Sequence, residues 1–107
     1  MLLALAEALA EVPQQERIHD LLFVTFGAEE MGLLGSKYMV EQMPPGQRSE
    51  VAAMINFDMV GRLRDNSVIV SGTGTSEPWP DLLERSRGDL LVKASEDGYG
   101  ASDQTSF

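Results

Sequence analysis

The chain has 107 residues, enough for one domain at residues 1–107 with a modest core. Its 17 acidic and 8 basic residues give a net charge of −9, so neither a nucleic acid nor an anionic membrane surface is an expected partner. It has no cysteine, which excludes disulfides and thiolate metal sites. No apolar run approaches the length of about 18 residues that a transmembrane helix needs.

Residues 1–12 are predicted to form an amphipathic helix. Leu2, Leu5 and Leu9 recur at helical spacing, and two glutamates interrupt the apolar run. The segment lacks the basic start of a secretory signal peptide, so we interpret it as a helix. The localisation of the protein is left open.

Two apolar runs, at 18–26 and 51–57, are predicted to be strands of one parallel sheet. Both are almost continuously apolar, which is typical of strands covered on both faces. A helical pattern from Leu33 to Met43 separates them and ends at two prolines. Strand, helix and strand in this order predict a βαβ unit.

Shorter elements are predicted in the second half of the chain. They are a strand at 67–71, a helix from Asp81 to Arg87 that begins near Trp79, and a strand at 90–92. Residues 96–107 have the composition of a loop. The whole pattern predicts an α/β fold with a mostly parallel sheet.

Three carboxylates follow the two predicted buried strands: Glu29 and Glu30 the first, and Asp58 the second. The carboxyl ends of parallel strands meet at one edge of a sheet, so we expect the three to converge. Like charges so close raise each other's pKa unless a cation lies between them. Carboxylates bind zinc, magnesium, manganese and calcium, and two ligands with one free base would suit metal-assisted hydrolysis.

Each carboxylate also has a purely structural interpretation. Glu29 and Glu30 precede a predicted helix, whose positive dipole end favours acidic side chains. Asp58 can bond to backbone amides in a turn. The single histidine, His19, stands about 30 Å before Glu29 along an extended strand, so we interpret it as a surface residue. The residues alone leave both interpretations of the carboxylates open.

Three segments resemble the M28 family of zinc aminopeptidases. Residues 26–36 resemble its double-glutamate segment, and residues 56–61 resemble its second metal segment. Residues 100–107 resemble its Ser-Asp-His-x-x-Phe segment near the substrate pocket. The resemblance covers essentially the whole chain and implies a zinc-exopeptidase-like three-layer sandwich around a mostly parallel central sheet.

The resemblance also implies roles for individual residues. Glu29 would be the general base, Glu30 would bind one zinc ion, and Asp58 would bind a second. The reaction implied is hydrolysis of the N-terminal bond of a peptide substrate: a hydroxide bridging the zinc ions attacks the carbonyl, and Glu29 passes the proton to the leaving amine. The residues expected near the substrate pocket are Ser102, Asp103 and Gln104.

The chain departs from the family pattern in its ligand set. The family uses five metal ligands, and here only Glu30 and Asp58 match them. Gln104 stands where many members have histidine. We therefore expect a domain truncated at both ends that is inactive or weakly active alone, with open sheet edges that favour self-association.

Two alternatives belong to other functional classes. One is a non-catalytic α/β binding module derived from a peptidase fold. The other is a carboxylate-only site for calcium or magnesium. The residue preference of a substrate pocket is left open.

Overall fold

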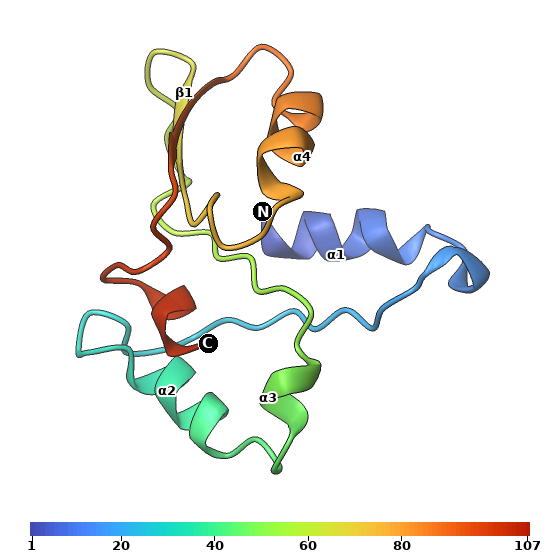
Figure 1. Ribbon diagram of the computed structural model, residues 1–107, viewed down its shortest axis with the longest axis vertical. Helices are drawn as coiled ribbons and strands as arrows, with labels where there is room; N and C mark the ends of the chain where they lie inside the picture. Colours follow the sequence, from blue (N-terminus) through green and yellow to red (C-terminus); the bar gives the residue numbers. More distant parts are fainter.

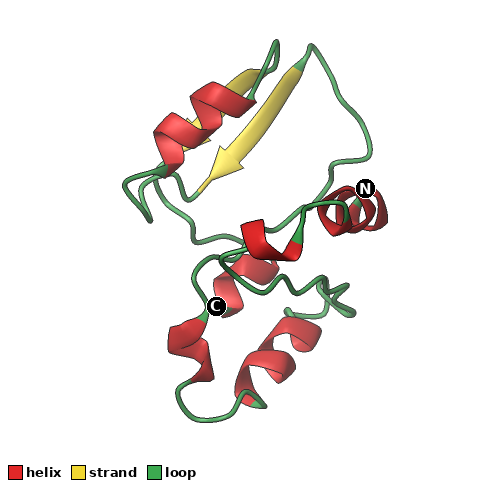
Figure 2. Cartoon of the chain, turned by 90° about the vertical axis from the view of Figure 1, so that its right-hand side faces the viewer, coloured by secondary structure: helices red, strands yellow, loops and turns green.

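A computed structural model describes residues 1–107, which form helices and one small sheet. Figures 1 and 2 show the sheet and its neighbouring helix at one end of the molecule and short helices at the other. The elements in chain order are α1 (Leu2–Ala10), η1 (Gln14–Glu16), α2 (Leu34–Glu41), α3 (Gln47–Glu50), β1 (Ser67–Ser71), α4 (Trp79–Ser86), β2 (Leu91–Ser95) and η2 (Asp103–Ser106).

The sheet consists of two parallel strands joined through α4. Strand β1 pairs with β2 in a register that sets Ser67 opposite Leu91 and Ser71 opposite Ser95. A proline in the first turn of α4 suits the start of a helix, because its missing N–H would have no partner there. The βαβ unit is therefore formed by residues 67–95. The strand, helix and strand predicted in this part of the chain are confirmed, with the second strand at Leu91–Ser95 instead of 90–92.

The helices predicted nearer the N-terminus are also confirmed, with shorter bounds. Helix α1 ends at Ala10, and α2 runs from Leu34 to Glu41. None of the helices combines the length and hydropathy that crossing a bilayer requires.

The two predicted buried strands at 18–26 and 51–57 are wrong. Both segments belong to neither a helix nor a strand, and no backbone hydrogen bond joins one to the other. A strand needs a neighbour to pair with its N–H and C=O groups, and neither segment has one. Leu22 is 75% exposed and Ile55 is 63% exposed, so the apolar side chains of these segments are not covered.

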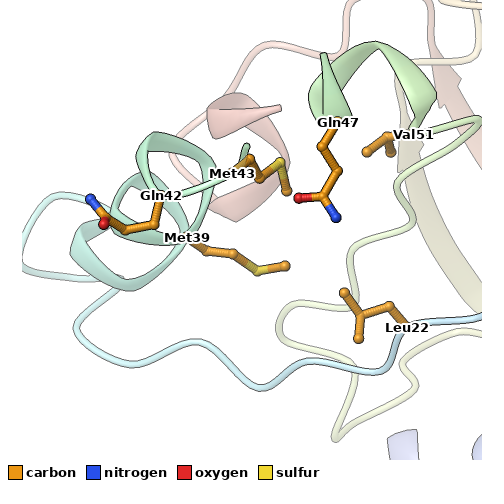
Figure 3. A pocket seen from close by; sticks show the side chains of 6 residues that line it. All are labelled: Leu22, Met39, Gln42, Met43, Gln47 and Val51. Atoms are coloured by element: carbon orange, nitrogen blue, oxygen red, sulfur yellow. The ribbon is translucent and has the colours of Figure 1, made fainter. Parts of the chain in front are cut away.

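The modest core expected from the chain length is also absent. No hydrophobic side chain is buried, and the buried side chains are those of Ser36, Thr73 and Asp103. Figure 3 shows one consequence: Leu22, Met39 and other side chains line an open pocket of ≈ 300 Å³ beside α2 and α3. The segments are joined mainly by polar contacts rather than by apolar packing.

Candidate active site

The double glutamate lies in a tight turn that leads into α2. The N–H groups of Gly32 and Leu33 donate to the carbonyl of Glu29 at 3.0 and 2.8 Å. Gly32 has a φ of +103°, a conformation that glycine adopts without steric cost. Leu33 precedes α2 in the left-handed region, with a φ of 61°. The turn therefore fixes the backbone at Glu29 and Glu30 before the helix begins.

Gly35 closes this turn against the chain that enters it. Its N–H donates to the carbonyl of Gly27 at 3.1 Å. A Cβ atom at residue 35 would lie 2.6 Å from that carbonyl oxygen, closer than real Cβ contacts. The contact leaves no room for a side chain at residue 35, which explains a glycine there.

A non-glycine residue in the left-handed conformation lies next to Glu29, and another lies next to Asp58. Ala28, directly before Glu29, has a φ of 56°, and Met59, directly after Asp58, has a φ of 53°. Such conformations cost free energy for L residues and gather at functional sites. Both acidic segments thus leave the extended chain through a strained residue.

The C-terminal segment packs against both acidic segments. Ser106 Oγ lies 2.8 Å from Ser36 Oγ, a hydrogen bond that joins η2 to α2. The rings of Phe107 and Phe26 lie 6.2 Å apart, so η2 also contacts the chain that leads to Glu29. Figure 1 shows η2 beside α2, although about 60 residues separate them in the sequence.

Asn56 joins the same C-terminal segment to the Asp58 segment. Its Nδ2 donates to Ser102 Oγ at 2.7 Å and to Gln104 Oε1 at 2.9 Å. Asn56 is absent from the residues that sequence analysis singled out. The sequence does distinguish Asn56, because it is the one polar residue in the apolar run 51–57.

Neighbouring negative charges act on the carboxylate of Glu29. Partial burial raises the pKa of Glu29 above its ordinary value, and the negative charges of Asp58, Asp103 and Glu30 raise this pKa further. The chain forms a single salt bridge, Arg87 with Glu84 on α4, so no basic side chain pairs with the carboxylates of this cluster. Carboxylates from three segments distant in sequence therefore act on one site.

Asp103 is the most buried member of this cluster. It is 7% exposed, and its Oδ1 atom has no hydrogen-bond partner. A buried polar atom without a partner costs free energy, so it needs a functional explanation or a ligand. Its neighbours Ser102 and Gln104 are half-buried and line, with Asp58, an open cavity of ≈ 1340 Å³ that extends toward α4.

The carboxylates do not by themselves complete a metal site. No three or more histidine, cysteine, aspartate or glutamate side chains lie close enough together to hold a metal ion. Protein zinc sites use three or four protein ligands. Glu30 and Asp58 are both exposed and each contributes one carboxylate, so the residues present do not fit a zinc ion on their own.

Comparison with known proteins identifies relatives. The family model described as "Peptidase family M28" matches residues 1–107. Leupeptin-inactivating enzyme 1 of Streptomyces exfoliatus is 46% identical over 41 residues, which cover 38% of this chain and 9% of that enzyme. An aminopeptidase of Pseudomonas aeruginosa (strain UCBPP-PA14) is 34% identical over 58 residues, 54% of this chain and 11% of that protein.

A third relative has a similar match. Aminopeptidase YwaD of Bacillus subtilis (strain 168) is 38% identical over 61 residues, 57% of this chain and 13% of that protein. The matched segments thus span between 9% and 13% of these relatives. No solved structure matches the chain significantly.

Proposed function

This chain belongs to peptidase family M28, and on that premise we propose that it is part of a zinc-dependent exopeptidase of aminopeptidase type. Its substrate is a peptide, and the bond hydrolysed is the N-terminal one. Two of the relatives described above are named aminopeptidases, which supports this substrate class. The third is named for inactivating leupeptin.

The observation that carries the proposal is that the negative charges of Asp58 and Asp103, from two other segments, act on Glu29. Glu29 has the properties of a general base for hydrolysis: its raised pKa makes the carboxylate a better proton acceptor. It takes a proton from the attacking water and passes the proton to the leaving amine. The site residues that line the cavity, Ser102 and Gln104, would contact the substrate.

Glu30 and Asp58 are the metal ligands that this chain contributes. Because they do not suffice for zinc, the remaining ligands come from other parts of a longer polypeptide, as the length of the relatives allows. Glu29 is not one of the ligands, so its carboxylate remains free to accept a proton.

The complete domain is a three-layer sandwich with a mostly parallel central sheet. The apolar side chains of the segments 18–26 and 51–57 are exposed here, and other segments of that domain would cover them. The two-stranded parallel sheet and its helix fit one end of such a domain.

A chimera tests the function. The residues of the Bacillus subtilis aminopeptidase that correspond to this chain are replaced by residues 1–107, and zinc-dependent release of an amino acid from a peptide anilide is measured. We expect hydrolysis to survive the replacement. Glu29→Gln should then lower kcat about 100-fold or more with the zinc content unchanged, whereas Glu30→Gln and Asp58→Asn should lower the zinc content.

The chimera experiment has a matched control variant and two outcomes that would favour the alternative functions. Glu41→Gln, which changes an exposed glutamate on α2, should leave both quantities unchanged. A folded chimera that binds zinc but does not hydrolyse the substrate would favour a non-catalytic binding module. Calorimetry on the 107-residue chain adds a second test, because a preference for calcium over zinc would favour the carboxylate-only site.

A further inference from the structure

Asn56 lies where the extended segment 51–58 meets the C-terminal segment. It is half-buried and stands two residues before Asp58. Because only Phe57 lies between them, a contact that holds Asn56 also restrains the backbone at Asp58. Its two hydrogen bonds, to Ser102 at 2.7 Å and Gln104 at 2.9 Å, are side chain to side chain.

The direction of these bonds is fixed by their chemistry. A carboxamide nitrogen has two N–H donors, and Asn56 directs Nδ2 to both acceptors. Gln104 accepts through Oε1, and its own Nε2 donates to the carbonyl of Gly98 at 3.3 Å. The Gln104 amide is therefore held at both ends: its oxygen accepts from Asn56, and its nitrogen donates to the carbonyl of Gly98.

The two residues that Asn56 holds lie on either side of Asp103. The buried carboxylate is thus fixed between two tethered neighbours, although its own Oδ1 has no partner. We propose that Asn56 is a positioning residue that fixes Asp103 beside the carboxylates of the Glu29 and Asp58 segments. Since carboxamides do not titrate, this link holds at any pH at which the chain is folded.

The positioning role rests on the proposed function for its purpose, but its test needs no hydrolysis. Amide hydrogen exchange of the 107-residue chain is measured at Thr105 and Phe107, whose N–H groups donate to Ser102 and Gln104 within the C-terminal segment. Asn56→Ala removes both tethers, and exchange at these amides should rise about tenfold or more. Asn66→Ala is the matched control, because Asn66 donates to Asp89 at the sheet and not to this segment.

A second variant separates the donor role from simple packing. Asn56→Leu keeps nearly the volume and shape of asparagine but has no hydrogen-bond donor. After correction for intrinsic exchange, Thr105 and Phe107 should therefore exchange as fast in Asn56→Leu as in Asn56→Ala.

The outcomes are decisive in both directions. Unchanged exchange in Asn56→Ala, or exchange in Asn56→Leu as slow as in the wild type, would overturn the positioning role. If the exchange results agree with the proposal while the chimera fails to hydrolyse its substrate, Asn56 still positions Asp103 and only the proposed function is lost.

Discussion

Gly35 lies directly against the backbone of Gly27, and only residue 35 lacks room for a side chain. A Cβ atom at residue 35 would be 2.6 Å from the Gly27 carbonyl oxygen and 2.9 Å from its nitrogen, whereas a Cβ at residue 27 would meet nothing within 4 Å. This contact closes the turn that contains Glu29 and Glu30. The geometry of the acidic turn therefore depends on the absence of a side chain at residue 35.

We expect Gly35→Ala to destabilise the chain by about 1–3 kcal/mol, because backbone atoms must move to admit the methyl group. The measurement is urea unfolding followed by circular dichroism. Gly27→Ala is the matched control on the other side of the contact, and it should be nearly neutral. Equal effects of the two substitutions would show that the close approach is not what limits residue 35.

Much of the local structure could be predicted from sequence, because it depends on local signals. The β1–α4–β2 unit follows from two short apolar runs around a helix with proline in its first turn. The convergence of the Glu29–Glu30 and Asp58 segments was predicted from a βαβ unit at 18–57 that the structure does not contain, and the Asp103 segment was not part of that prediction. They meet instead through η2, held by contacts such as Ser36 with Ser106.

The absence of strands at 18–26 and 51–57 and the contacts of Asn56 could not be predicted, because they depend on segments distant in the sequence. An apolar run such as 51–57 indicates burial on both faces, but a strand forms only where a second backbone completes its hydrogen bonds. Sequence patterns also do not reveal which residue bridges two segments. Asn56 interrupts an apolar run, and only its distances to Ser102 and Gln104 show why.

The left-handed conformation of Ala28 leads to a prediction about stability. Glycine adopts a φ of 56° without the Cβ penalty, so Ala28→Gly should stabilise the chain by about 0.5–1 kcal/mol after its greater unfolded-state entropy is counted. Ala8→Gly, an exposed position inside α1, should instead destabilise it by about 0.5–1 kcal/mol. Urea unfolding of both variants measures the difference. A loss of stability in both would contradict the strain at residue 28.

The raised pKa of Glu29 predicts a pH dependence with a definite sign. The folded chain binds the proton more tightly than the unfolded chain, whose glutamate titrates near 4.5. Ionisation of Glu29 therefore opposes folding, and its contribution to stability falls as the pH rises from about 4.5 through the higher folded pKa. Glu29→Gln removes this charge and should flatten the dependence in that window.

Unfolding midpoints across this pH range, compared among wild type, Glu29→Gln and Glu41→Gln, provide the measurement. Glu29→Gln should flatten the curve, because burial and the negative charges of three other carboxylates raise the pKa of Glu29, and Glu41→Gln is the control. A wild-type chain that becomes more stable with rising pH, relative to Glu29→Gln, would contradict the assigned direction.

The exposed segments 18–26 and 51–57 predict self-association. They present unpaired backbone groups and apolar side chains, a combination that templates pairing with a second chain. A lysine in such a segment blocks edge pairing, so Ile55→Lys should shift the chain toward monomer in light scattering. Leu3→Lys makes the same exchange at a residue that is 87% exposed on α1, where no strand edge is available, and should leave the association unchanged. A wild-type chain that is monomeric at all concentrations would contradict the self-association. Equal effects of the two lysine substitutions would show that the association does not involve the segment 51–57.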